Sequence, residues 1–111
     1  MKPLFAALLI ATTVSAAQNT PKAQTFTGVI TDEMCAGVGH AAMRMGPTDA
    51  ECARLCVTSH GAMWVLEAGK DIYILSDQQT PDTFAAQKVT VVGTLDAKTK
   101  TIQVKSIAAA K

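Results

Sequence analysis

Five short segments of alternating apolar residues constrain the fold of this chain most strongly. They cover residues 25–31, 63–66, 72–75, 88–95 and 101–107, and polar or turn-forming residues separate them. Alternation over about four to eight residues is typical of a β-strand with one buried face. A sheet of so few short strands has unpaired edges unless it curls on itself, so we expect a small five-stranded β-barrel rather than a sandwich.

Two helical segments are expected to interrupt these strands. Thr48 followed by Glu51 is the pattern of a capping box, which predicts a helix over residues 49–59. A second, shorter helix is expected to start at Thr80, before Pro81. The predicted order is therefore a strand, a helix-bearing insertion, a hairpin, a short helix and two final strands.

The beginning of the chain has the pattern of a secretory signal peptide. Lys2 is followed by an apolar run over residues 4–14, and small residues offer cleavage after Ala16 or Ala17. The run is shorter than the roughly 20 apolar residues of a membrane span. We therefore expect a signal peptide over residues 1–17 and a secreted or periplasmic protein, in preference to a retained membrane anchor.

The rest of the chain is expected to form one domain. Residues 18–24 are polar and predict a flexible leader, and residues 25–111 are close to the usual domain size, with no internal linker. The chain has ten Lys and Arg residues, so removal of Lys2 leaves nine against nine Asp and Glu residues. This balanced charge gives no electrostatic footprint for nucleic acid or for an anionic membrane, and we expect neither as a partner.

One stretch holds nearly all the side chains that bind soft metal ions. Residues 34–63 contain all three cysteines, both histidines and four of the five methionines. Thiolate, imidazole and thioether are ligands that select copper(I) or zinc. The predicted metal ligands are Cys35, His40, Cys52, Cys56 and His60, with Met43 and Met45 as additional ligands.

A second interpretation makes the cysteines purely structural. Exported proteins tend to form disulfides, and three cysteines cannot all pair within one chain. Cys52 and Cys56 are four residues apart on the predicted helix, and thiols on successive turns of a helix bond poorly to each other. A disulfide is therefore expected from Cys35 to Cys52 or Cys56, which would contribute about 3 kcal/mol to stability.

Catalytic patterns are absent from the sequence, so we do not expect an enzyme. The chain has neither the CxxC spacing of thiol oxidoreductases nor the CxxCH motif of haem attachment. Ser59 and His60 are adjacent at a helix end and do not face each other. Asp32 and Glu33 follow the first strand and are expected in a solvated turn, where Asp32 would serve at most as an outer ligand or to orient a histidine.

Three groups of residues also carry a family resemblance. They are GVITDEMC at 28–35, the Cys52 and Cys56 pair, and VTVVGTL at 89–95 after Phe84. Over residues 25–107 the chain resembles uncharacterised families of small secreted bacterial proteins with an OB-like barrel. It departs from their pattern at Ala36, where they have glycine, and Gly37 follows instead. The resemblance implies a fold more than an activity.

The sequence therefore predicts a mainly β protein, a small OB-like barrel with a helix-bearing insertion between its first two strands. The first functional hypothesis is a secreted or periplasmic, monomeric or weakly associating protein that binds copper or zinc, for buffering or delivery in the cell envelope. The alternative is a disulfide-stapled envelope binding or stress module without metal. Its partner would be a small ligand or an envelope protein.

Overall fold

The structure is a computed structural model of the 111-residue chain, and it describes residue 3, residues 10–11 and residues 22–111. The predicted signal peptide and residues 18–21 of the predicted leader otherwise lie outside the described residues. The first strand begins at Gln24, which is the last residue of the predicted leader. In the described ranges, no helix has the length and apolar character needed to span a bilayer.

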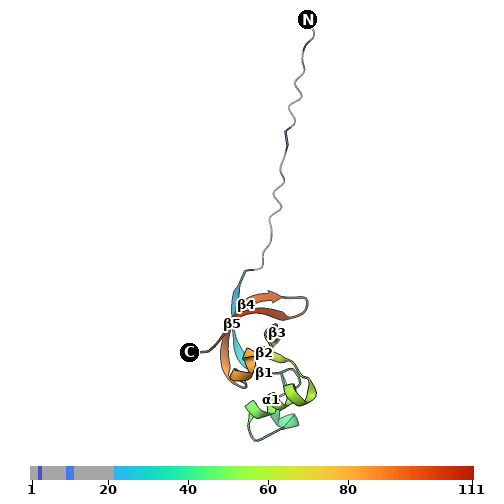
Figure 1. Cartoon of the computed structure of the whole chain (residues 1–111), viewed down its shortest axis with the longest axis vertical. Coiled ribbons are helices and arrows are strands. Elements are labelled where there is room, and N and C mark those ends of the chain that lie inside the picture. Colours follow the sequence, from blue (N-terminus) through green and yellow to red (C-terminus); the bar gives the residue numbers. More distant parts are fainter. Residues whose placement is uncertain (1–2, 4–9, 12–21) are drawn as a thin grey trace.

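Five strands form one sheet that closes on itself (Figure 1). They are β1 (Gln24–Asp32), β2 (Trp64–Ala68), β3 (Asp71–Leu75), β4 (Lys88–Asp96) and β5 (Thr101–Ala109). They pair in the order β1-β2-β3-β5-β4, and β1 also pairs with β4. Only the pairing of β3 with β5 is parallel. The predicted mainly β fold with five strands is confirmed, and closure gives each strand two neighbours.

The insertion between β1 and β2 carries α1 (Asp49–His60), which confirms the predicted position of the helix. The Thr48 hydroxyl accepts a hydrogen bond from the Glu51 backbone N–H at 3.2 Å, and Gly61 ends the helix with a φ of 68°. This left-handed conformation suits glycine, which has no Cβ to clash. The described residues also contain two 3-10 helices: η1 (His40–Met43), which the sequence did not predict, and η2 (Thr80–Phe84). Figure 1 shows α1 and the loop before it at one end of the sheet.

The buried side chains form two clusters. The larger one fills the inside of the sheet and contains Ile30, Ala53, Trp64, Leu66, Leu75, Ala85, Val89, Val91 and Ile102. The smaller one lies within the insertion and contains Cys35, Cys52, Cys56 and Ala62. All three cysteines of the chain therefore belong to the smaller cluster, with Ala62 as its fourth buried residue.

Candidate metal site

The turn after β1 places the first two donor groups. Asp32 is the last residue of β1 and its side chain is fully buried. Its Oδ2 accepts hydrogen bonds from the backbone N–H groups of Met34 and Cys35, both at 3.1 Å. A carboxylate that takes two successive amides in this way fixes a tight turn. The turn buries the Cys35 side chain at 2% exposure, next to Asp32.

His40 begins η1 and reaches back to the end of β1. One ring nitrogen, Nε2, lies 3.2 Å from the Thr31 hydroxyl. The other, Nδ1, lies 3.9 Å from Asp32 Oδ1, which is too long for a hydrogen bond. His40 Nδ1 and Asp32 Oδ1 are both buried and both lack a hydrogen-bond partner. Because buried polar atoms are nearly always paired, these two atoms are the most unusual feature of the site.

The helix α1 contributes Cys52 and Cys56, which are four residues apart and both fully buried. Cys52 Sγ donates to the Met43 carbonyl oxygen at 3.5 Å and accepts from the Met45 backbone N–H at 3.3 Å. Cys56 Sγ lies 3.9 Å from Met45 Sδ. The thioether of Met45 therefore lies against the cluster, whereas the Met43 side chain is 39% exposed and only its backbone contacts a thiol.

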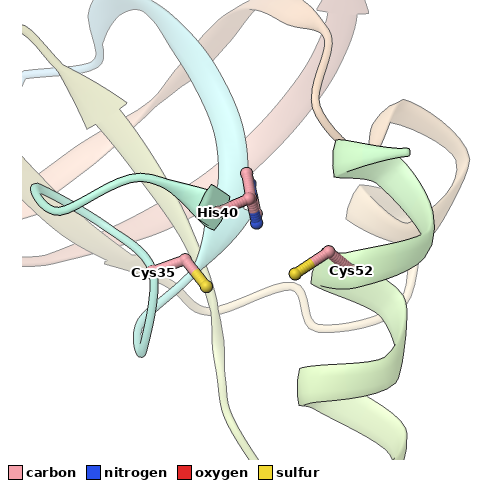
Figure 2. A group of neighbouring side chains, drawn as sticks. All are labelled: Cys35, His40 and Cys52. Carbon is pink, nitrogen blue, oxygen red and sulfur yellow. The ribbon is translucent and has the colours of Figure 1, made fainter. Parts of the chain in front are cut away.

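The donor atoms form two groups that share Cys35. In the first group, one atom each from Cys35, His40 and Cys52 lie within 4.8 Å of one another. In the second group, the same holds for Asp32, Cys35 and Cys56. Figure 2 shows the first group, with the side chains of Cys35, His40 and Cys52 converging from three different segments. These distances suit a shared ion, because two ligands of one ion lie at most about twice the metal–sulfur bond of 2.3 Å apart.

Burial and negative charge make the thiols of Cys35 and Cys56 hold their protons when no cation is near. Burial raises the pKa of Cys35 from 9.0 to about 12, and the charges of Asp32 and Cys56 add to the effect. Burial also raises the pKa of Cys56, with Asp32 as the next cause. A bound cation reverses this balance, because its positive charge stabilises the thiolates.

A cavity of about 370 Å³ opens onto the first group. Its lining includes Val29, Thr31, Cys35, His40, Asp49 and Glu67. Cys56 and Asp32 are not among its lining residues, and all three members of the second group are buried. The cavity is therefore lined by two members of the first group, Cys35 and His40, and by the shared Cys35 alone in the second group.

The structure brings together four of the five predicted ligands. His60 is exposed at the end of α1 and belongs to neither group. Asp32 was missed as a donor, and the expectation that it lies in a solvated turn is wrong because it is fully buried. The signal that points to it is its position three residues before Cys35, where an aspartate commonly accepts the amides of the following turn.

The expected disulfide is not formed in the structure. Cys35, Cys52 and Cys56 are all free thiols, although Cys35 Sγ lies within 4.8 Å of a donor atom in each of the other two. A disulfide bond is about 2.05 Å long, so either bridge requires the two sulfur atoms to come closer together, by rotation of the side chains or by movement of the turn or α1. The bridge from Cys35 therefore stays a prediction for the oxidised protein.

The fold and the site together define a small mainly β protein with a buried cluster of thiol, imidazole and carboxylate groups. Comparison with protein families, characterised proteins and solved structures found no match to the chain. The donor groups and their geometry are therefore the basis for assigning a function.

Proposed function

We propose that this protein binds a soft metal ion, copper(I) or zinc, through Cys35, His40 and Cys52. The observation that carries the proposal is the buried Nδ1 of His40, which has no hydrogen-bond partner although Cys35 and Cys52 lie next to the ring. An unpaired buried nitrogen is costly unless it meets a polar or ionic partner. A metal ion supplies that partner and also stabilises the two thiolates.

The contact between Thr31 and His40 supports this role. A metal-binding histidine normally uses its second ring nitrogen for a hydrogen bond that fixes the ring orientation and the tautomer. The Thr31 hydroxyl, 3.2 Å from Nε2, is placed to make that bond and leaves Nδ1 for the ion. Three protein ligands would leave a further position on the ion, and Cys35 and His40 line the cavity. An open position suits an ion that is taken up and passed on.

The proposal extends to fold and location. The strand order β1-β2-β3-β5-β4, closed by the pairing of β1 with β4, is consistent with an OB-like barrel. The signal-peptide pattern and the resemblance to small secreted proteins support a periplasmic or secreted, monomeric or weakly associating protein. Its job would be metal buffering or delivery, with no turnover of a substrate.

The test is metal binding by the full chain expressed with its own export signal, purified from the periplasm and reduced. Copper(I) and zinc are each titrated against a competing chelator, and native mass spectrometry counts the bound ions. We expect His40→Ala to weaken binding at least tenfold and His60→Ala, the matched control at an exposed histidine, to leave it unchanged. An equal loss in both variants, or no ion bound by the reduced wild type, would overturn the proposal.

The same measurement addresses the alternative interpretation. A protein that binds no ion and carries one intramolecular disulfide and one alkylatable thiol would be a stapled envelope binding or stress module. The free thiols in the structure and the unpaired Nδ1 of His40 favour the metal site instead. The two outcomes differ in mass, so a single spectrum with and without alkylation separates them.

A further inference from the structure

We infer that the cluster holds two copper(I) ions rather than one, with the Cys35 thiolate bridging them. This inference rests on the proposed function and extends it. The first ion would lie between Cys35, His40 and Cys52, and the second between Asp32, Cys35 and Cys56. Cys35 is the only residue common to both groups, which is why it would be the bridge.

Geometry argues against one ion bound by all five residues. Ligands of the same ion cannot lie further apart than twice the metal–ligand bond, about 4.6 Å for sulfur. Within each group of three, the donor atoms lie within 4.8 Å of one another, which is close to this bound. The donor atoms of all five residues do not lie that close together. Two positions are therefore needed to use all the donors, and each position has three of them.

The buried carboxylate of Asp32 is an independent sign of the second position. Its side chain is fully buried, its Oδ2 is held by two backbone amides, and its Oδ1 has no hydrogen-bond partner. A buried charge without a compensating partner is strongly unfavourable. The groups next to this carboxylate are the His40 ring, whose Nδ1 lies 3.9 Å from Oδ1 and is too far for a hydrogen bond, and the thiols of Cys35 and Cys56, which are weak donors. A cation between Asp32, Cys35 and Cys56 compensates the carboxylate directly.

Each group contains two cysteines, and this pair of thiolates favours copper(I) at both positions. Three protein ligands do not by themselves exclude zinc, which takes four in structural sites and three with a water in open sites. Copper(I) accepts three ligands and prefers thiolates and thioethers. The Met45 thioether, 3.9 Å from Cys56 Sγ, lies at the second position and adds a further soft atom there.

The two ions would exchange at different rates. The cavity is lined by His40 of the first group and by the shared Cys35, whereas Asp32 and Cys56 of the second group are not among its lining residues. A chelator added to the loaded protein should therefore remove one ion quickly and the other slowly. The first position would serve for transfer, and the second would hold the insertion against β1.

The experiment loads the full exported chain, reduced and free of metal, with excess copper(I) under anaerobic conditions. We expect native mass spectrometry to count two ions in the wild type and one in each of Cys52→Ser and Cys56→Ser. X-ray absorption should show a copper–copper scattering path in the wild type that is lost in both variants. In Cys35→Ser we expect neither the bridge nor a second ion, and His60→Ala serves as the unchanged control.

Three results separate this inference from the proposed function. One copper per wild-type chain at excess copper(I), unchanged in Cys56→Ser, would refute the second position and leave the first intact. Two ions without a copper–copper path would refute the bridge. No bound copper at all would overturn both proposals. Circular dichroism of each variant identifies any that fails to fold, and a Cys→Ala change at the same position then replaces it.

Discussion

Raising the pH should destabilise the metal-free protein through Cys35. The thiol ionises near pH 9.0 when unfolded and near pH 12 in the fold, because burial and the Asp32 charge oppose its ionisation. Since the folded pKa is the higher one, the stabilisation is complete below pH 9 and is lost as the pH rises towards 12. At about 1.4 kcal/mol per pH unit, the loss is about 4 kcal/mol over the whole window and about 2 kcal/mol at pH 10.5.

Urea unfolding at pH 7.5, 9.0 and 10.5 measures this effect, with a phosphine reductant to keep the thiols free. Trp64 is the only tryptophan and is buried, so its fluorescence reports unfolding. Other groups also contribute at alkaline pH, so the wild type is compared with Cys35→Ala, in which their contribution is retained. We expect the wild type to lose about 2 kcal/mol more than the variant between pH 7.5 and 10.5.

Equal losses in the wild type and in Cys35→Ala would refute the reasoning, because Cys35 would then ionise alike in the folded and unfolded states. The copper(I)-loaded protein provides a second comparison. The ion already holds Cys35 as the thiolate, so no proton is left to lose. We expect the additional loss to disappear in the loaded wild type.

Three further predictions concern the fold and the redox state. Gly28→Ala should destabilise the protein by about 1–3 kcal/mol in urea unfolding, because a Cβ there would overlap a backbone carbonyl of β2. Gln78→Ala should cost about 1–3 kcal/mol, because the Gln78 side chain bonds both the N–H and the carbonyl of Trp64, and the exposed Gln79→Ala is its control. Oxidation to a disulfide from Cys35 should abolish copper(I) binding in native mass spectrometry, since both donor groups need that thiol; full binding by the bridged protein would contradict the assignment.

The strands were predictable because their signal is local. The alternation at residues 88–95 reproduces β4 to within one residue. The largest differences are at the ends of β2 and β5, which each continue two residues beyond the expected segment. β1 continues one residue beyond Thr31, to Asp32, which pairs with Trp64. This last pair depends on where the chain returns after the insertion. Similarly, η1 is only four residues long and has no buried residue, so it has no periodicity to detect.

The clustering of soft ligands along the chain pointed to Cys35 and His40, and helix geometry pointed to Cys52 and Cys56. Cys52 and Cys56 share a face because they are four residues apart, and the structure buries both. His60 was expected to continue that face, but two steps of four residues rotate it by about 80° from Cys52, and it lies exposed at the end of α1. Asp32 could not be recognised as buried, because its burial depends on the insertion folding back over the end of β1.

The composition of the insertion's core explains why metal binding and local folding should be coupled. Its buried residues are three cysteines and Ala62, with Met45 and Val57 partly buried beside them. Such small side chains bury little apolar area, and a helix as short as α1 is marginal without packing. The predicted ligands come from the turn after β1, from η1 and from α1, so one bridged pair of ions would join all three segments. The closed sheet has its own, larger core, to which α1 contributes only Ala53 among the buried residues, so the ion would order the insertion while the sheet supplies a fixed base.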